Sequence, residues 1–374
     1  MRWSFQIGRV FGIPIRVHIT FFILPAIVWF AGATRGALIG GLTGVIFVLA
    51  LFVCVVIHEL AHSLVARRYG VEVRDITLLP IGGVSNMDRI PEDPKQELAI
   101  AAVGPIVSAG IFVVIAVFLT LVGVDAFSAP PLHDVIGSRM TLVGFIQQLM
   151  WINLLLAIFN LIPAFPMDGG RILRAFLAER MDYVKATHAA SAVGQVFAFV
   201  FGFVGLFINP WLIIIAVFIY MGAGQEEAQV QVRRVLRGVP ASAAMITRFD
   251  VLRAQETLGH ALARAGTGFQ HDFPVVADDH VVGMVTHEDL LRGLHEVGPE
   301  HPVGEVMRTD ICERAVQDSL QDVYDEVAQG KCPVVAIMSG GVLTGLVTPE
   351  SVSTYLMNAT RHATIDRQRM RLGQ

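Results

Sequence analysis

Residues 38–66 read LIGGLTGVIFVLALFVCVVIHELAHSLVA, an apolar stretch interrupted near its end by two histidines and a glutamate. A helix of about 20 apolar residues is enough to cross the core of a bilayer. Ionisable side chains inside such a run are costly and are usually functional. His58 and His62 are four residues apart, so both imidazoles lie on one helical face, with Glu59 beside them. This spacing is the HExxH pattern, in which two histidines bind one zinc ion.

The composition indicates that the chain has two unlike parts. Its 374 residues are 54% hydrophobic and only 16% charged, whereas an ordinary soluble domain is about 25% charged. Of the 60 charged residues (28 basic and 32 acidic), 26 lie in the first 224 positions and 34 in the last 150. Apolar runs predict about six transmembrane helices, over residues 20–32, 38–66, 98–122, 142–163, 189–208 and 211–224. We therefore expect a membrane α-helical part followed by a soluble α/β part.

The loops between these runs predict the orientation in the membrane, because positively charged loops stay cytoplasmic. Most basic residues flank one set of helix ends, namely Arg2, Arg9, Arg16, Arg67, Arg68, Arg74, Arg171, Arg174, Arg180 and Lys185. The loops on the opposite side hold only Arg35 and Arg139. We expect a multi-pass protein of the cell membrane with both its N-terminus and its C-terminus in the cytoplasm.

Net charge and cysteine content exclude two further classes of protein. A net charge of −4 provides no basic field for nucleic acid, so we expect no nucleic-acid partner. Cys54, Cys312 and Cys332 are too few and too scattered for a disulfide framework. We expect the two C-terminal cysteines to be free thiols in a reducing compartment.

Residues 71–85, VEVRDITLLPIGGVS, begin with the alternation of a β-strand. Non-helical backbone at membrane depth is tolerated only where protein shields it or where it lines a cavity. We interpret this stretch as a small β-sheet at the cytoplasmic face of the membrane part.

Two histidines leave a catalytic zinc site incomplete, since such a site has three protein ligands and a fourth position open to water. The fourth predicted span ends in FNLIPAFPMDGGRIL, residues 159–173. Here two prolines interrupt the helix before Asp168, and two glycines after it permit close approach of another segment. Asp168 is the carboxylate nearest to a span on the same predicted side as His62. It is our candidate for the third ligand.

Three alternatives to this assignment stay open on the residues alone. Asp168 could instead cap the helix that follows it. His188, near the start of a later span, could be the ligand, although no motif surrounds it. Cys54 lies one turn before His58 and could supply a soft sulfur ligand, but a small buried apolar residue is the account that we favour for it.

The combination of HELAH in one span with NLIPAFPMDGGR at the end of another resembles the site-2 protease family of intramembrane zinc metalloproteases, whose pattern is HExxH followed by NxxPxxxxDG. The resemblance covers residues 1–224. It implies that His58, His62 and Asp168 bind one Zn²⁺ per chain and that Glu59 is the general base. It also implies that Asn160 helps to hold the substrate or the oxyanion.

Two shorter segments share in this resemblance. Gly104 and Pro105, in AAVGPIVSAG, match the small-residue pattern of the family's third core helix. The GGVSNM segment, residues 82–87, is similar to the family's strand-forming region beside the active site.

The last part of the chain repeats itself with a period of about 60 residues. ASAAMIT (241–247) matches PVGEVMRT (302–309), FPVV (273–276) matches CPVV (332–335), and GMVTHEDL (283–290) matches GLVTPESV (345–352). The repeats resemble a tandem pair of cystathionine-β-synthase (CBS) domains, regulatory modules that often bind adenine nucleotides. The predicted organisation is a zinc metalloprotease domain (1–224), a linker helix (225–238), the tandem CBS pair (239–360, with repeats 239–298 and 299–360) and a basic tail (361–374).

The CBS resemblance also predicts a nucleotide site. The family's GxxTxxD pattern occurs in the first repeat as Gly283, Thr286 and Asp289. It implies that Thr286 contacts phosphate and Asp289 contacts ribose in ATP, ADP or AMP. The second repeat keeps Thr348 but has Ser351 in place of the aspartate, which puts a second site in doubt. The alternative is that the pair only packs and forms a homodimer.

We therefore predict an intramembrane zinc endopeptidase that cleaves single-span membrane proteins, such as a membrane-tethered regulator, in regulated intramembrane proteolysis. Adenine nucleotide bound to the CBS pair is expected to modulate it. A CBS-gated metal or ion transporter and an inactive protease that serves as a receptor are the alternatives. Glu59 favours hydrolysis, because transport needs only ligands whereas hydrolysis also needs a base. The complete set of catalytic residue types disfavours the inactive protease.

Overall fold

The structure is a computed structural model that describes residues 3–34, 38–87, 91–128, 141–267, 270, 272–277, 280–328 and 330–372. The chain forms two compact units, Met1–Ala228 and Gln229–Gln374. Arg35 and Arg139, which entered the prediction of orientation, lie outside the described residues. The domain bounds given above remain a prediction.

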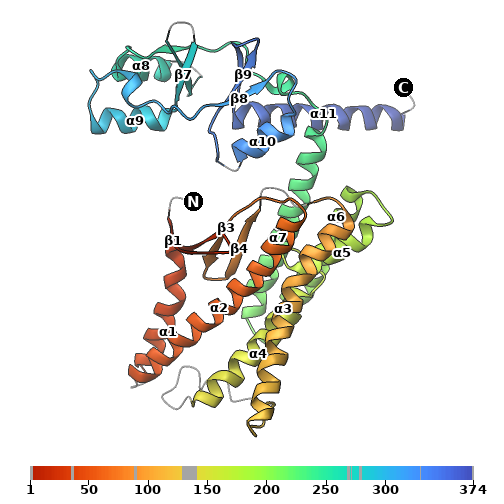
Figure 1. Ribbon diagram of the computed structural model, residues 1–374. Coiled ribbons are helices and arrows are strands. Elements are labelled where there is room, and N and C mark those ends of the chain that lie inside the picture. Colours follow the sequence, from red (N-terminus) through yellow and green to blue (C-terminus); the bar gives the residue numbers. More distant parts are fainter. Residues whose placement is uncertain are drawn as a thin grey trace. The chain divides into compact units, whose positions relative to one another are not determined.

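The first unit is built mainly of helices (Figure 1). They are α1 (Ile23–Thr34), α2 (Leu38–Arg68), α3 (Pro94–Leu121), α4 (Leu142–Asn160), α5 (Asp168–Ala178), α6 (Tyr183–Phe207) and α7 (Trp211–Leu236). Within the described residues, five of them (α2, α3, α4, α6 and α7) are long and apolar enough to cross a membrane. These five helices coincide with five of the apolar runs from which the spans were predicted.

The first predicted span is shorter than expected. Its apolar helical stretch covers only Ile19–Gly32, and helix α1, which overlaps this stretch, has 12 residues that extend about 18 Å. A bilayer core is about 30 Å thick. The residues that lead into this stretch, Ile13–His18, form a β-strand and add nothing to the length of the span.

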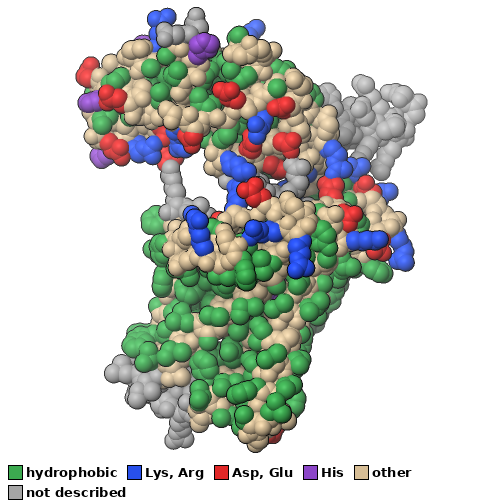
Figure 2. All heavy atoms as spheres, viewed as in Figure 1, with side chains coloured by type: hydrophobic (Ala, Val, Ile, Leu, Met, Phe, Trp, Pro, Cys, Tyr) green, Lys and Arg blue, Asp and Glu red, His purple; other side chains and the backbone are tan. Residues whose placement is uncertain are grey.

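The surface of the first unit suits a lipid environment. Hydrophobic side chains cover its helices on the face shown in Figure 2. Phe199 and Phe207 of α6 are 76% and 75% exposed, and Val114 of α3 is 68% exposed. Contiguous apolar exposure of this kind is rare on proteins surrounded by water. Lys and Arg side chains gather at the end of the unit where the sheet lies.

A four-stranded sheet lies at one end of this unit, with strand order β1-β2-β3-β4. Its strands are β1 (Ser4–Val10), β2 (Ile13–His18), β3 (Val73–Leu79) and β4 (Gly82–Met87). β2 and β3 are parallel, while the two outer pairs are antiparallel. Strands β3 and β4 confirm the predicted sheet at residues 71–85. The first hairpin was not predicted; its inward residues Ile13 and Ile15 pack with Ile76 of β3 and Leu60 of α2.

The second unit contains the repeat that the sequence predicts. The first copy consists of β5 (Leu252–Arg253), α8 (Leu258–Thr267), β6 (Phe273–Ala277), β7 (His280–Val285) and α9 (His287–Glu296). The second consists of β8 (Cys312–Ala315), α10 (Leu320–Ala328), β9 (Val335–Ser339), β10 (Val342–Val347) and α11 (Pro349–Leu372). In each sheet the first strand is parallel to the second, and the second is antiparallel to the third. Helix α11 continues through most of the segment predicted as a basic tail.

The two copies exchange the segments that precede them. Ile246, ahead of the first copy, forms a β-bridge with Leu346 of β10 in the second copy. Arg308, ahead of the second copy, forms a β-bridge with Met284 of β7 in the first copy. Each copy therefore completes the sheet of the other.

The structure corrects the expectation of free C-terminal thiols. Cys312 and Cys332 form a disulfide, with their Cα atoms 6.2 Å apart. Strand β8 runs parallel to β9 and places Cys312 opposite Val335, three residues after Cys332. This pairing depends on the sheet and has no spacing signature in the sequence. Cys54 is free and buried, as expected.

Candidate metal centre

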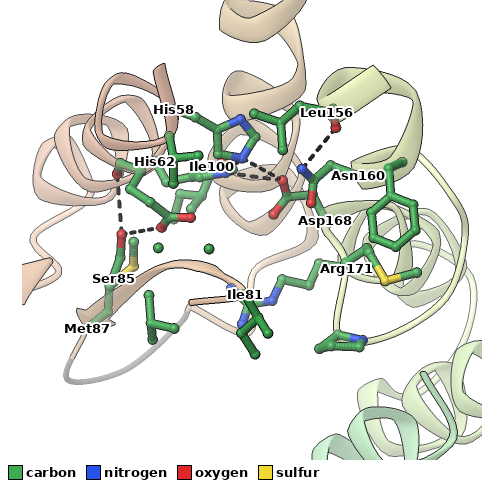
Figure 3. Close-up of a pocket in the computed structure, with 18 of the residues that line it drawn as sticks. His58, His62, Ile81, Ser85, Met87, Ile100, Leu156, Asn160, Asp168 and Arg171 are labelled. Carbon is green, nitrogen blue, oxygen red and sulfur yellow. Dashed lines mark hydrogen bonds and ion pairs between the residues drawn. The ribbon is translucent and has the colours of Figure 1, made fainter. Parts of the chain in front are cut away.

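The HELAH and NLIPAFPMDGGR motifs of the first unit meet at a cavity of about 340 Å³. Helix α2, the β3–β4 turn with β4, the end of α4 and the start of α5 all contribute to its lining. Figure 3 shows His58, His62 and Asp168 pointing toward one another in this cavity, with Asn160 and Arg171 nearby. Segments about 110 residues apart in the sequence thus form one site.

His58, His62 and Asp168 have the geometry of a metal site. Nε2 of His58 lies 3.1 Å from Nε2 of His62. Oδ2 of Asp168 lies 3.3 Å from the first of these nitrogens and 3.2 Å from the second. Tetrahedral zinc with N and O ligands at about 2.0–2.2 Å places its ligand atoms about 3.3 Å apart. The three side chains therefore fit Zn²⁺ without rearrangement.

The protonation chemistry of these ligands also fits a cation. The buried Oδ2 atom of Asp168 has no hydrogen-bond partner of good geometry among the described residues. Burial alone would raise the pKa of Asp168, but the contacts with His58 and His62 outweigh burial and hold this pKa below the usual carboxyl range. An anionic oxygen that faces two imidazole nitrogens and lacks a good donor is a suitable ligand for a metal ion.

Helix α3 orients both histidines from behind. Nδ1 of His58 lies 2.9 Å from Oγ of Ser108, and Nδ1 of His62 lies 2.6 Å from the carbonyl oxygen of Ile100. Because Nδ1–H of His62 donates to that carbonyl, its Nε2 carries a lone pair toward the metal position. Neither partner was identified from sequence, although Ser108 is the one hydroxyl within the apolar residues 98–119 of α3.

Position 104 has room only for glycine, because the two histidines pack directly against it. A Cβ atom there would lie 2.1 Å from Nε2 of His62 and 2.7 Å from Nε2 of His58. The backbone of α3 therefore occupies the space beside the metal ligands. At the start of α5 the same logic applies: a Cβ on Gly169 would lie 2.2 Å from the carbonyl oxygen of Ile162. The close approach that we predicted for this glycine involves the segment just before it.

Glu59 lies in the cavity but outside the three-ligand cluster. Ser85 of β4 donates a 2.6 Å hydrogen bond to its Oε2 atom. Oγ of Ser63, one turn further along α2, lies 3.3 Å from Oγ of Ser85. The backbone of β4 also packs against this side chain, since a Cβ on Gly83 would lie 2.6 Å from Cγ of Glu59. Ser85 was not singled out from sequence.

Of the other residues proposed from sequence for this site, Asn160 lies at the cavity, whereas His188 and Cys54 do not join the cluster. Asn160 lines the cavity, and its Nδ2 donates to the carbonyl oxygen of Leu156 at 3.0 Å. Arg171, which the sequence did not mark as a site residue, is the one Lys or Arg among the described residues of the lining. His188 is 73% exposed at its side chain and lies 2.7 Å from Glu227. Within the described residues, neither His188 nor Cys54 joins the ligand cluster.

In the second unit, Thr286 and Asp289 lie together at the start of α9. Thr286 caps this helix and forms a capping box with Asp289. The buried Asp289 carboxylate also pairs with Arg308 at 3.0 Å and with Arg292. Burial alone would raise the pKa of Asp289, but the hydrogen bonds from Arg308 and Thr286 lower it.

The corresponding positions of the second copy are Thr348 and Ser351. Their hydroxyls cap the start of α11: Ser351 N–H donates to Oγ1 of Thr348 at 3.2 Å, and Thr348 N–H donates to Oγ of Ser351 at 3.0 Å. Ile246 stands where the first copy has Arg308, so this site carries neither member of the ion pair.

A set of apolar helices that enclose two histidines, an aspartate and a separate glutamate defines the class of membrane-embedded zinc metallopeptidases. Comparison with known proteins agrees: Peptidase family M50 matches residues 46–201, and the CBS domain matches residues 241–296. A zinc metalloprotease of Methanocaldococcus jannaschii is 32% identical over 359 residues, which cover 94% of this chain and 96% of that protein. Rip3 of Mycobacterium tuberculosis is 29% identical over 378 residues, which cover 94% of this chain and 93% of Rip3.

Among solved structures, the site-2 protease from Methanocaldococcus jannaschii is 38% identical and matches 60% of this chain and 95% of its own, with a TM-score of 0.43. The chain belongs to Peptidase family M50, the site-2 protease family. It is a zinc metalloprotease with a C-terminal CBS region. The transporter alternative is thereby set aside.

Proposed function

We propose that this zinc metalloprotease is an intramembrane endopeptidase that cleaves single-span membrane proteins within or next to their transmembrane segment. The observation that carries the proposal is the position of the His58, His62 and Asp168 cluster: both histidines lie on α2, a helix apolar enough to cross a membrane, and Asp168 at the start of α5 lies against them. A membrane-tethered regulator is the kind of substrate that such an enzyme would release. The basic residues at the sheet end of the first unit support a cytoplasmic location for this end.

The residues of the cavity have distinct parts in the reaction. Zinc held by His58, His62 and Asp168 would act as a Lewis acid on the scissile carbonyl and would acidify a water molecule. The Glu59 carboxylate takes the proton of the attacking water and returns it to the leaving amine. Ser85 holds Oε2 of Glu59 in place while this transfer occurs. Asn160 is positioned at the wall of the cavity, where an amide can bind substrate backbone.

The edge of the sheet offers a binding mode for an unwound substrate. Strand β4 pairs only with β3 within the described sheet, so its other edge is available, and its residues line the cavity. The carbonyl groups of a transmembrane helix are occupied by internal hydrogen bonds. A substrate that unwinds next to β4 can exchange those bonds for bonds to the strand. We propose that β4 presents the scissile peptide bond in this way.

The direct test uses the purified full chain in detergent and a panel of single-span membrane proteins. We expect cleavage within or beside the apolar segment of at least one substrate, loss of cleavage with a zinc chelator, and recovery when zinc is added. A matched substrate whose apolar segment is replaced by polyleucine should be cleaved more slowly, because polyleucine is harder to unwind. Cleavage that persists in chelator, or that is confined to loops remote from the membrane, would contradict the proposal.

We further propose that the CBS pair binds one adenine nucleotide at Thr286 and Asp289 and modulates the protease. The buried Asp289 carboxylate supports this site, because a carboxylate is a good acceptor for ribose hydroxyls. Arg308 and Arg292 beside it supply cations that can meet phosphate. A nucleotide can change activity only by binding one arrangement of the CBS pair more tightly than another. The second copy, with Thr348 and Ser351, lacks the carboxylate.

Calorimetry on the full chain with ATP, ADP and AMP tests this site. We expect one nucleotide per chain, with affinity reduced about 10- to 100-fold by Asp289→Asn, since hydrogen bonds to a charged group contribute about 1.5–3 kcal/mol. Ser351→Ala is the matched control and should leave affinity unchanged. Absence of heat and of any thermal shift at millimolar nucleotide would leave the pair as a dimerisation or docking module.

A further inference from the structure

A buried ion network lies beside the metal site and has no part in the reaction described above. Arg174 of α5 is 1% exposed. Its Nε and one terminal nitrogen donate to Oε1 of Glu97 in α3 at 2.8 and 2.5 Å, and its other terminal nitrogen donates to Oε1 of Glu226 in α7 at 2.8 Å. One guanidinium thus joins three helices.

Two aromatic rings complete the enclosure of this guanidinium. Its central carbon lies 5.0 Å from the ring centre of Phe165 and 4.9 Å from that of Tyr183. Burial of an arginine is strongly unfavourable unless the charge is paired and hydrogen-bonded. The five hydrogen donors of a guanidinium have a fixed planar geometry. The network therefore tolerates little relative movement of α3, α5 and α7.

The network closes a ring of contacts through the metal ligands. Glu97 lies one turn before Ile100, whose carbonyl oxygen holds His62. Arg174 lies on the helix that begins with Asp168, and Phe165 belongs to the loop just before that residue. Metal sites require ligand distances within about 0.2 Å of their ideal values. A small shift of α5 against α3 would therefore move the Asp168 oxygen out of range of the two histidines.

We propose that Arg174 is a positioning residue for the zinc site, and that Glu226 makes this positioning depend on helix α7. The inference rests on the proposed zinc site. Glu226 is the only arm of the network that lies on α7, and the same helix continues to Leu236, which is fully buried in the hydrophobic core of the second unit. Through Glu226, a change in α7 acts directly on the buried Arg174.

The neighbouring residue provides a matched control. Glu227 also lies on α7 and also forms an ion pair, but its partner is the exposed His188 and not the buried Arg174. Glu226→Gln and Glu227→Gln remove the same charge from adjacent positions of one helix. Only the first should affect the metal site. Glu226→Asp keeps the carboxylate on a shorter side chain and should therefore retain part of the zinc affinity that Glu226→Gln loses.

The experiment measures zinc affinity of the full chain by competition with a chromophoric chelator, and the visible absorption of the cobalt-substituted protein. We expect Glu226→Gln to weaken zinc binding about tenfold, the lower range for residues that support metal ligands, and to shift the cobalt spectrum. Arg174→Lys, which keeps the charge and loses the planar fork, should act in the same direction. Glu227→Gln should change neither quantity.

The outcomes separate this inference from the proposed function. If the parent protein binds no zinc, the proposed zinc site fails and the inference fails with it. If the parent protein binds one zinc but Glu226→Gln and Glu227→Gln give the same affinity and the same cobalt spectrum, the zinc site stands and the positioning role is overturned. A weakened affinity with a shifted spectrum for Glu226→Gln alone supports the positioning role.

Discussion

Glu59→Gln is expected to lower the rate of peptide-bond cleavage by about 10²- to 10⁴-fold, the range that a general base contributes, while zinc content stays at one per chain. The amide has nearly the shape of the carboxylate and can still accept the hydrogen bond from Ser85, so the cavity keeps its form. It cannot accept a proton from water. Cleavage of a single-span substrate and metal analysis on the same preparation check both parts of the expectation.

Two comparisons make this result specific to Glu59. Glu227→Gln removes a carboxylate of the same unit away from the cavity and should leave cleavage unchanged. Zinc content separates a lost base from a lost ligand, because Glu59 is not a member of the cluster formed by His58, His62 and Asp168. Loss of zinc in Glu59→Gln would show that Glu59 is a ligand and would contradict the assignment.

Asp168→Asn should abolish cleavage and weaken zinc binding by more than the roughly 10- to 100-fold typical of residues that only support a ligand. A neutral amide is a poor zinc ligand, and the substitution removes the anionic oxygen that lies 3.3 and 3.2 Å from the two imidazole nitrogens. Competition with a chelator measures the change in affinity directly.

The control for this prediction is His188→Gln, because His188 was the competing candidate for the third ligand. Its side chain is exposed and pairs with Glu227, so zinc affinity should not change. Wild-type affinity in Asp168→Asn together with reduced affinity in His188→Gln would transfer the ligand role. The two variants therefore decide between the residues without any assay of proteolysis.

The cluster of His58, His62 and Asp168 was predictable from sequence because each part of it carries a local signal. His58 and His62 are one helical turn apart, so the pattern alone places them on one face. For Asp168 the signal is weaker: two prolines before it interrupt a predicted span, and two glycines after it permit close packing. The β3–β4 hairpin followed from alternation in residues 71–85. The duplicated second unit followed from its internal repeat.

The features that escaped prediction depend on contacts between distant residues. Ser108 meets His58 across 50 positions, Ser85 meets Glu59 across 26, and Arg174 meets Glu97 across 77. No periodicity reports such pairs. The disulfide of the second copy is of the same kind.

The first hairpin escaped for a different reason. Strand β2 alternates between fully and partly buried residues, so all of its side chains face protein to some degree. Its sequence, IPIRVH, is only six residues long and lies directly before the apolar run of residues 20–32. Length arguments for membrane spans cannot separate a short buried strand from the start of a helix.

The exchange of leading segments between the two CBS copies limits how this part of the chain can change in evolution. A chain cut after residue 298 would lose the Arg308 bridge to Met284 and would leave the partner segment of Ile246 absent. Both losses expose strand edges that invite pairing with other chains and hence aggregation. We therefore expect evolution to add or remove the two copies together. A single copy is not expected to fold as an independent domain.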